Sequence, residues 1–276
     1  MHERRGGGVD AGILIDPAAR PVIAHRGDSA HFPENTIPSF DRAVELGADA
    51  IEFDLRVSRD GEVVVIHDPT VDRTTDGTGA VSSLTLAELK RLDAGARFST
   101  DGGRTFPFRG RGLTIPTFDE MLARYASIPL LIEVKLPDAG RRAPAILDRH
   151  GASRRVVLDS TDADALEPFR GLPFTTGASL RDIVSILPRA LVGLPLGQVP
   201  YRAFCLPEWY NGIPVPVRRL ARAGRRAGFP THVWTVNDPG TAESLWRDGI
   251  NGIISDDPGT MLALRARVDA ARTPPN

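Results

Sequence analysis

The sequence contains little cysteine, no long apolar run and no excess of either charge. Its single cysteine, Cys205, excludes an internal disulfide framework among the 276 residues. No stretch approaches the roughly 18 consecutive apolar residues that a membrane-spanning helix needs. Lys and Arg together number 34 against 35 Asp and Glu. No overall charge therefore favours nucleic acid or an anionic membrane as a partner.

The two ends of the chain have the composition of flexible segments. Residues 1–20 contain Arg and Gly but no apolar segment as long as a secretory signal requires, so we expect a flexible leader and a cytoplasmic location. Residues 267–276 are expected to be a flexible tail. Residues 21–266 then form one domain, a length that suits a single α/β barrel.

Short β-branched runs alternate with amphipathic stretches through this domain. Several of these stretches end in Gly, a common helix stop. Repeated βα units favour a parallel sheet, either closed into a barrel or left open. No G-x-G-x-x-G follows the first run, which removes the main support for an open dinucleotide-binding sheet. We therefore predict an α/β fold of the TIM-type (β/α)8 barrel class.

Nine segments have the character of strands, one more than the barrel needs. We expect the extra segment to be 174–180 or 203–207. The nine are residues 21–25, 49–57, 62–68, 129–136, 154–160, 174–180, 203–207, 231–237 and 252–256.

The second and third strand segments are joined by four residues, Ser-Arg-Asp-Gly at 58–61. A parallel crossover needs a much longer connection, so this link predicts an antiparallel hairpin. A turn centred between Arg59 and Asp60 would place Glu52 opposite His67. Residues 69–116, rich in Gly, Thr and Arg, then interrupt the βα rhythm. We predict that they form a small insertion after the third strand.

Acidic residues occupy unusual places in the apolar strands. Glu52 and Asp54 lie two apart and share a face, as do Glu133 and Lys135. Buried carboxylates facing the same way repel one another unless a cation compensates. Three carboxylates at strand ends suit a hard divalent cation with oxygen ligands, Mg²⁺ or Ca²⁺, better than zinc.

Two histidines and two cations accompany these carboxylates. His25 and Arg26 end the first strand, and His67 ends the hairpin. Together with Lys135 and a metal ion they would form a site for a phosphate ester. One imidazole would take a proton and the other would donate one.

The segment "AHRGDSAHFPENTIPSFDRAVELGADAIEFDLRVSRDGEVVVIHDPTVDRTTDGTG" closely resembles the signature of the glycerophosphodiester phosphodiesterases, as do "IEVK", "VWTVND" and "GINGIISDDP". The resemblance spans roughly residues 21–265. It implies a TIM-type barrel with a family-type insertion at 69–116, and metal-dependent hydrolysis of glycerophosphodiesters to glycerol phosphate and an alcohol.

The resemblance also implies roles for individual residues. His25 and His67 match the acid and base, and Arg26 and Lys135 match the cations that bind the phosphate. Trp234 matches a position facing the glycerol end of the pocket. The three metal carboxylates correspond to Glu52, Asp54 and Glu133. Glu34 and Asn35 also match the family pattern, but we interpret them as a helix start capped by Asn35. Cys205 is expected to be a small core residue.

The segment 183–212 departs from the family pattern and holds four aromatic residues within ten positions. It is either a packed loop or an apolar rim that contacts a lipid tail or a membrane surface. A lysophospholipase D acting on lipid-tailed diesters is therefore an alternative to the glycerophosphodiester hydrolase. A non-catalytic barrel that binds a phosphate ligand is a further alternative from a different class. The oligomeric state is not indicated by the sequence.

Overall fold

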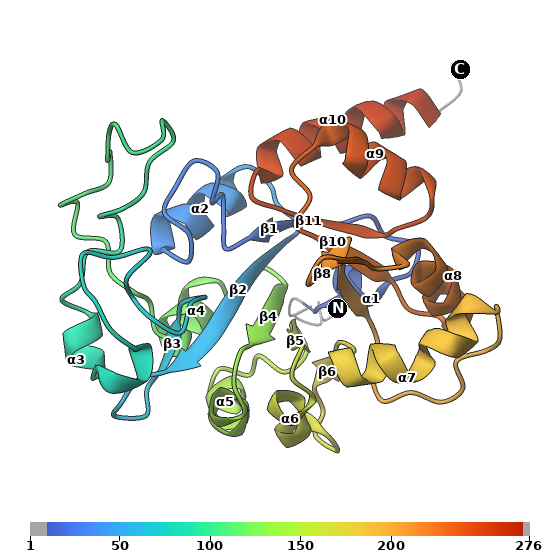
Figure 1. Ribbon diagram of the computed structural model, residues 1–276, viewed down its shortest axis with the longest axis horizontal. Coiled ribbons are helices and arrows are strands. Elements are labelled where there is room, and N and C mark those ends of the chain that lie inside the picture. The colour runs from blue at the N-terminus through green and yellow to red at the C-terminus, as the bar shows by residue number, and fades with distance from the viewer. Residues whose placement is uncertain (1–9, 273–276) are drawn as a thin grey trace, which may run out of the picture.

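The computed structural model describes residues 10–272, which form a barrel of eight parallel strands (Figure 1). The strand order is β6-β5-β4-β2-β1-β11-β10-β7, and a parallel bridge from Gly177 to Ala203 joins the two ends of this path. The eight strands are β1 (Val22–His25), β2 (Ala50–Val57), β4 (Leu130–Val134), β5 (Val156–Asp159), β6 (Thr175–Thr176), β7 (Phe204–Pro207), β10 (Thr231–Trp234) and β11 (Gly252–Ser255). The predicted TIM-type barrel is confirmed.

The extra strand is β3 (Val63–Val65), which pairs antiparallel with β2 outside the ring. Our expectation that 174–180 or 203–207 would be the extra segment was wrong, because β6 and β7 both belong to the barrel. These two strands are short, and their meeting point is only a bridge. The four-residue link between β2 and β3 is too short for the crossover that a parallel strand needs. β3 therefore pairs with β2 outside the ring.

The predicted hairpin exists, but its register differs by one residue. Leu55 pairs with Val65 and Val57 with Val63, so Asp54 rather than Glu52 lies across from the segment leading to His67. The Ser58 amide donates to the Glu62 carbonyl at 2.9 Å, which closes a loop of three residues, 59–61. Gly61 adopts a φ of 88°, the left-handed conformation that such a loop requires.

Helices follow the strands and cover the outside of the barrel, with α5 and α6 below it and α9 and α10 above it in Figure 1. Capping boxes begin α4 at Thr117 and α7 at Ser179, and Gly228 ends α8 in a left-handed conformation. The helices are α1 (Gly12–Ile15), α2 (Ile37–Glu45), α3 (Leu86–Leu89), α4 (Phe118–Arg124), α5 (Pro137–Arg149), α6 (Ala163–Leu166), α7 (Leu180–Leu191), α8 (Val217–Ala227), α9 (Pro239–Arg247) and α10 (Pro258–Arg272), with 3₁₀ turns η1 (Val81–Ser83) and η2 (Glu167–Phe169).

A two-stranded hairpin, β8 (Trp209–Tyr210) and β9 (Ile213–Pro214), follows β7 and stands apart from the barrel sheet. Trp209 and Ile213 are both exposed on it. The segment 183–212 therefore spans most of α7, a connection, the barrel strand β7 and the first strand of this hairpin, β8.

The inside of the barrel is filled by one small apolar cluster, and α1 closes it at the amino ends of the strands. Leu14 of α1 is fully buried against this cluster, and its carbonyl accepts from the His232 ring at 2.8 Å. Residues 11–15 of the expected flexible leader are thus packed, because Leu14 plugs the base of the barrel. Residues 1–9 lie outside the described residues. The cluster consists of Ala11, Leu14, Ile23, Ala50, Leu131, Val157, Cys205 and Ile254.

The insertion at 69–116 has its own small core, built from residues such as Val71, Val81 and Leu89 packed under Val64 and Ile66 of the hairpin. It lies to the left of the barrel in Figure 1. At the other end of the chain, α10 continues to Arg272 and so includes part of the expected tail.

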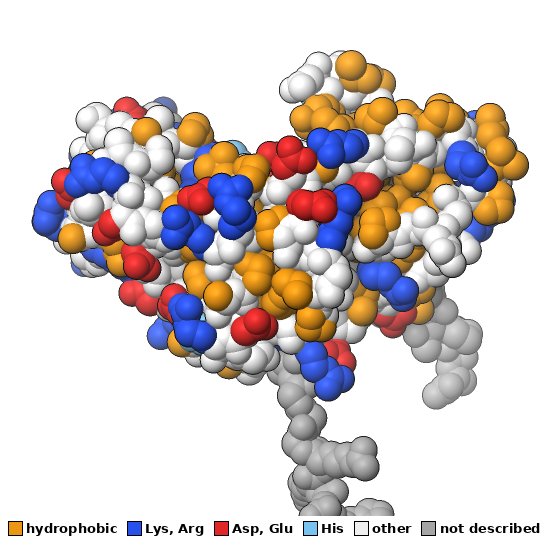
Figure 2. Space-filling model, turned by 90° about the horizontal axis from the view of Figure 1, so that it is seen from below, with side chains coloured by type: hydrophobic (Ala, Val, Ile, Leu, Met, Phe, Trp, Pro, Cys, Tyr) orange, Lys and Arg blue, Asp and Glu red, His pale blue; other side chains and the backbone are white. Residues whose placement is uncertain are grey.

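The surface carries mixed charge. Figure 2 shows basic and acidic side chains interspersed among apolar ones on the face seen from below. Among the described helices, none combines the length and the apolar character needed to cross a membrane.

We expect Leu14→Ala to lower the free energy of unfolding by about 3 kcal/mol, because it opens a cavity beneath the barrel core. Val44→Ala, at a position 40% exposed on α2, is the control and should change it by less than about 0.5 kcal/mol. Urea unfolding followed by circular dichroism measures both. Equal effects of the two substitutions would contradict the role of α1 as a plug.

Candidate active site

Three carboxylates meet at the carboxyl ends of neighbouring strands. The register pairs Asp54 of β2 with Glu133 of β4, and Glu52 precedes Asp54 on the same face. One oxygen from each of the three lies within 4.8 Å of the others. The predicted convergence of these residues from two separate segments is therefore present, at the end of a barrel where active sites are found.

Asp54 is fully buried, and basic groups compensate its charge. Lys135 Nζ lies 2.9 Å from Oδ1, and Arg26 Nε lies 3.2 Å from Oδ2. Asn35 donates a further hydrogen bond to Oδ2 at 2.9 Å. Burial alone would raise the pKa of Asp54, but Lys135 and Arg26 lower it to about 2.

The pKa of Glu52 is shifted in the opposite direction from that of Asp54. Burial and the nearby charge of Asp54 raise the pKa of Glu52 to about 7. Lys135, which pairs with Asp54, also forms an ion pair with Glu133, with Nζ 2.6 Å from Oε2. The cluster as a whole thus holds more negative charge than its protein partners neutralise.

His25 projects from the end of β1 and is held by Asp256, which follows β11. Its Nδ1 lies 2.6 Å from Asp256 Oδ1, and its Nε2 lies 4.0 Å from Glu52 Oε2. Asp256 also accepts hydrogen bonds from Ser29 at 2.9 Å and Asn237 at 2.6 Å. Burial opposes the protonated ring, but the bond to Asp256 and the charge of Glu52 raise the pKa of His25 above its usual range.

His67 has the same kind of support but a different electrostatic setting. Its Nδ1 lies 2.6 Å from Asp68 Oδ1, and Arg73 donates to both oxygens of that carboxylate. Burial lowers the pKa of His67, and the positive charge of Lys135 adds to this effect against that of Asp54. The pKa values of the two imidazoles are therefore shifted in opposite directions.

Arg26 reaches the cluster because its backbone adopts a φ of 56°, with Gly27 following at 91°. Both values lie in the left-handed region, which is uncommon for a residue other than glycine. The Arg26 amide donates to Glu52 Oε2 at 3.1 Å, and its guanidinium donates to Glu34 at 2.8 Å. Glu34 in turn pairs with Arg73 at 2.6 Å.

The interpretation of Asn35 as a helix cap was wrong. Thr36 is the cap residue of α2, while Asn35 has a φ of 55° and uses its side chain on Asp54. Glu34 also belongs to the site through Arg26 and Arg73. A short polar loop after a strand has the same composition whether its residues start a helix or enter an active site. Only the position of the carboxylates in the fold distinguishes these two roles.

A cavity of about 100 Å³ opens between these groups. Seven of the eight predicted site residues line it, and the eighth, Asp54, is completely covered beside it. Trp234 and Thr235 form one wall. The predicted residues in the lining are His25, Arg26, Glu52, His67, Glu133, Lys135 and Trp234.

The sequence interpretation missed the groups that hold the two histidines, together with Asp159. Asp256 carries no local signal, because its partner His25 lies 231 residues away in the chain. Asp68 and Arg73 did have a local signal, since Asp68 follows His67 directly and Arg73 lies five residues further on. Asp159 did have a signal, since it is an acidic residue at the end of an apolar strand, and Glu133 is the penultimate residue of another. It pairs in register with Glu133 and lines the cavity.

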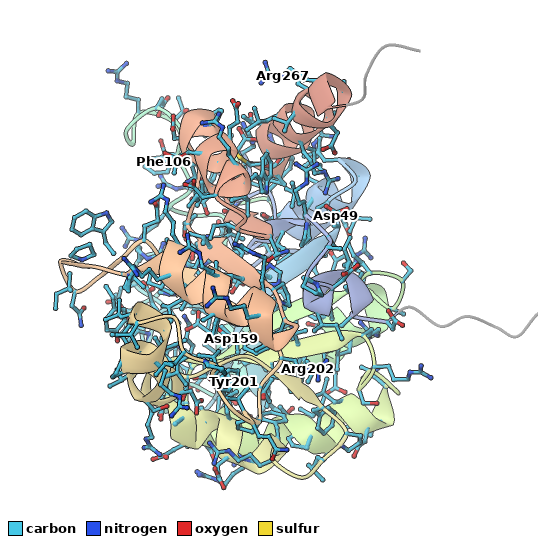
Figure 3. The ribbon with its side chains drawn as sticks, turned by 90° about the vertical axis from the view of Figure 1, so that its right-hand side faces the viewer. Asp49, Phe106, Asp159, Tyr201, Arg202 and Arg267 are labelled. Carbon is cyan, nitrogen blue, oxygen red and sulfur yellow. The ribbon has the colours of Figure 1, made fainter. Side chains whose placement is uncertain are left out.

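Asp159 and Cys205 meet at the far wall of the cavity. Burial and the charge of Glu133 raise the pKa of Asp159 well above its usual range. Burial and the charge of Asp159 likewise raise the pKa of the Cys205 thiol. Cys205 is thus a small buried residue, as expected, but one that also faces the site. Asp159 is labelled in Figure 3.

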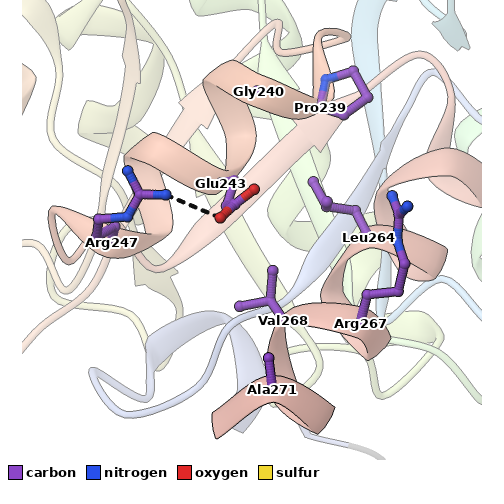
Figure 4. A pocket seen from close by; sticks show the side chains of 8 residues that line it. All are labelled: Pro239, Gly240, Glu243, Arg247, Leu264, Arg267, Val268 and Ala271. Atoms are coloured by element: carbon purple, nitrogen blue, oxygen red, sulfur yellow. Dashed lines mark hydrogen bonds and ion pairs between the residues drawn. The ribbon is translucent and has the colours of Figure 1, made fainter.

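Two other features of the described residues lie apart from this chemistry. A larger cavity of about 540 Å³ lies between α9 and α10 and contains the Glu243–Arg247 ion pair (Figure 4). A small group of Asp28, His31 and Asp257 lies on the loops at the ends of β1 and β11. Neither of these two features has both a pair of imidazoles and a set of carboxylates on one cavity.

The residues present fit a divalent cation. Glu52, Asp54 and Glu133 offer only oxygen donors, the set that hard cations prefer. Burial, followed by the charges of Asp54 and Glu133, raises the pKa of Glu52, and a bound cation would oppose these effects.

Similarity to known proteins agrees with the fold. The chain matches the glycerophosphoryl diester phosphodiesterase family over residues 25–260. It is 36% identical over 260 residues to a glycerophosphodiester phosphodiesterase of Caldanaerobacter subterraneus subsp. tengcongensis, a match covering 88% of this chain and 96% of that protein.

Solved structures of the same class superpose on most of the chain. An Oleispira antarctica phosphodiesterase, in complex with the product sn-glycerol-3-phosphate, has a TM-score of 0.73 and 26% identity, covering 90% of this chain and 97% of that one. A glycerophosphodiester phosphodiesterase from Thermotoga maritima has a TM-score of 0.68 and 29% identity, covering 89% and 98%.

Asp256→Asn should lower the pKa of His25, because it removes the charge that favours the imidazolium. NMR titration of the histidine rings without added divalent cation measures this pKa. Glu243→Gln, which removes a distant carboxylate on α9, is the control and should leave it unchanged. A His25 pKa equal in wild type and Asp256→Asn would show that Asp256 does not control this ring.

Proposed function

The chain belongs to the glycerophosphoryl diester phosphodiesterase family and is an enzyme of that class, and from this premise we propose that His25 and His67 hydrolyse its substrate beside one divalent cation. The observation that carries the proposal is the pair of imidazoles with opposite pKa shifts on one cavity. Groups whose environments push their pKa values apart are suited to acid and base roles.

His25 is the proposed general acid and His67 the proposed general base. The bond to Asp256 raises the pKa of His25, which favours donation of a proton to the oxygen of the departing alcohol. Burial lowers the pKa of His67, which favours the neutral ring that takes a proton from the attacking hydroxyl. That hydroxyl comes from water or from the glycerol of the substrate. Its oxygen bonds to phosphorus as the ester bond to the alcohol breaks.

Arg26 and Lys135 are proposed to bind the phosphoryl oxygens. Both are more than four-fifths covered, and both lie on the cavity beside the two rings. Their positive charge would favour the added negative charge of the transition state. Asp256 and Asp68 hold the rings by Nδ1, which leaves each Nε2 for the substrate.

Glu52, Asp54 and Glu133 are proposed to hold Mg²⁺ or Ca²⁺. When bound, such an ion would polarise the phosphoryl oxygens and neutralise part of their charge. The three carboxylates are already positioned by strand register, so binding needs little rearrangement of the backbone.

The substrate is a small molecule, in line with the glycerol phosphate bound by the Oleispira antarctica relative. We propose a glycerophosphodiester, cleaved to glycerol phosphate and an alcohol. A cytoplasmic location stays a prediction.

A second candidate, lysophospholipase D-type cleavage of lipid-tailed diesters, is favoured by one observation. Exposed large apolar side chains gather between residues 180 and 213, including Val184, Val192, Trp209 and Ile213. Contact of the segment 183–212 with lipid remains a proposal. Comparing glycerophosphocholine with lysophosphatidylcholine as substrates separates the two candidates.

His25→Ala and His67→Ala should each reduce kcat for glycerophosphocholine by ~10²-fold or more, since each removes a proton-transfer group. Release of glycerol phosphate, followed by a coupled assay, measures the loss. His150→Ala, at the end of α5, is the matched control and should retain activity. Near-normal turnover in either active-site variant would refute the role of that histidine.

Removal of divalent ions with a chelator should abolish turnover, and addition of Mg²⁺ or Ca²⁺ should restore it. Isothermal titration with each ion gives a second readout that does not depend on activity. Glu133→Gln should weaken ion binding at least about tenfold, because it removes one charged ligand. Glu62→Gln, on the exposed hairpin loop, should not. Full activity in excess chelator would contradict metal dependence.

A further inference from the structure

Asp28 carries a buried carboxylate that no basic side chain neutralises. It lies two residues after Arg26 in the loop that follows β1, and its side chain is only 3% exposed. Its carboxyl group has one hydrogen-bond partner among the described residues, the ring of His31 at 2.8 Å. The buried carboxylate of Asp54, in contrast, has both Lys135 and Arg26 beside it. Buried charges in proteins are paired with an opposite charge or coordinate a metal ion.

A second carboxylate, that of Asp257, adds negative charge at the same place. Asp28, His31 and Asp257 each offer one ligand atom, and these atoms lie within 4.8 Å of one another. Asp257 precedes α10, where its carboxyl group accepts from the Thr260 amide at 2.9 Å and from the Thr260 hydroxyl at 2.6 Å. Within residues 10–272, no lysine or arginine forms an ion pair with Asp28 or Asp257. Even a protonated His31 would neutralise only one of the two carboxylates.

The contact between His150 and Asp119 provides a comparison within the same chain. His150 Nε2 lies 2.9 Å from Asp119 Oδ1, nearly the same distance as in the pair of His31 and Asp28. The Asp119 side chain is 42% exposed, however, and Arg149 forms an ion pair with it at 2.9 Å. A contact between histidine and aspartate is therefore not a site by itself. Burial of the carboxylate, the missing basic partner and the second aspartate distinguish the cluster of Asp28.

The donor atoms of this cluster differ from those of the active-site carboxylates. The cluster combines two carboxylates with an imidazole nitrogen, whereas the active-site set has oxygen donors alone. Imidazole suits Zn²⁺ and similar cations, while Mg²⁺ and Ca²⁺ prefer oxygen. Two ligands of one zinc ion lie roughly 3 Å apart, and His31 Nδ1 lies 2.8 Å from Asp28 Oδ1. The His31 side chain is 56% exposed, so water can complete the coordination.

We propose that Asp28, His31 and Asp257 bind one divalent cation that accepts nitrogen as well as oxygen ligands, with Zn²⁺ as the probe. The ion takes the place of the proton between His31 Nδ1 and Asp28 Oδ1, and that proton leaves to solvent. None of the three ligands lines the cavity of the two active-site histidines. The proposed ion is therefore distinct from the one held by the active-site carboxylates, and this inference does not depend on the proposed function.

The proposed ion would join two loops that meet beside the active site. Asp28 lies on the loop after β1, and Asp257 directly follows Asp256, which holds the ring of His25. One backbone hydrogen bond already joins these loops, from the Ala30 amide to the Asp256 carbonyl at 2.9 Å. An ion bound to both loops should make their separation rarer, and the exchange of the Ala30 amide with solvent reports such separation.

Titration with Zn²⁺, followed by NMR of ¹⁵N-labelled histidine rings, tests the proposal because each ring reports its own surroundings. The His31 ring nitrogens should shift at Zn²⁺ concentrations at least about tenfold below those that shift His150, whose site lacks a second carboxylate. His25 and His67 report the active site separately in the same spectra.

Three variants remove one ligand each. Asp28→Asn and Asp257→Asn remove a charged ligand with little change of shape, and asparagine at 257 can still accept from Thr260. Each should raise the Zn²⁺ concentration that shifts His31 at least about tenfold. Asp119→Asn is the matched control and should leave the His31 response unchanged. His31→Gln, at an exposed position, removes the imidazole without risk to folding.

Hydrogen exchange at the Ala30 amide gives a readout that does not depend on a histidine. At free Zn²⁺ ten times the dissociation constant, loop separation that releases the ion should become about tenfold rarer in the wild type. In His31→Gln the same Zn²⁺ concentration should leave the exchange rate of this amide unchanged. Equal slowing in both proteins would show that Zn²⁺ does not join the loops through His31.

The remaining outcomes separate the two cation sites. A His31 response at the same Zn²⁺ concentration as that of His150, or one unchanged in both asparagine variants, would overturn the proposal. Shifts confined to His25 and His67 would also overturn it, because Zn²⁺ would then bind at the active site alone. Turnover in excess chelator, with the His31 response present, would contradict the metal dependence of the proposed function and support this inference.

Discussion

Repulsion between buried carboxylates is the constraint on which the rest of this structure depends. Glu52, Asp54 and Glu133 bring oxygens within 4.8 Å of one another at the ends of two neighbouring strands. Parallel pairing places them there, and no single basic residue can neutralise all three. Arg26 and Lys135 converge on Asp54, while Glu52 stays unneutralised with a pKa of about 7. The excess of negative charge is what makes the site suitable for a cation.

The barrel separates the groups that stabilise it from the groups that react. Below the site, an apolar cluster closed by Leu14 fills the interior and gives the strands a fixed register. Above it, loops supply the partners of the reactive side chains. Asp256 follows β11, whereas Arg73 comes from the insertion and ties it to Glu34 and Asp68. The insertion therefore does more than cover the barrel, since it helps to orient His67.

The second candidate substrate class has a structural basis in a path that leaves the polar cavity. That cavity ends at Asp159, Cys205 and Trp234, and an apolar cavity of about 310 Å³ begins at the same residues. A change from charged to hydrocarbon walls across three side chains suits a molecule with the same change along its length. This arrangement depends on α7 and the β8–β9 hairpin.

The sequence by itself determined the barrel, the hairpin and seven of the eight candidate residues, because β-branched runs, a four-residue link and misplaced charges are local patterns. The eighth, Trp234, came from the resemblance to the family. The tertiary structure alone decided the hairpin register, the place of β6 and β7 in the ring, and the role of Asn35 on Asp54. It also decided that Asp256 holds His25 and that Asp159 lines both cavities. These contacts join residues far apart in the chain, and ring closure, rather than local preference, brings them together.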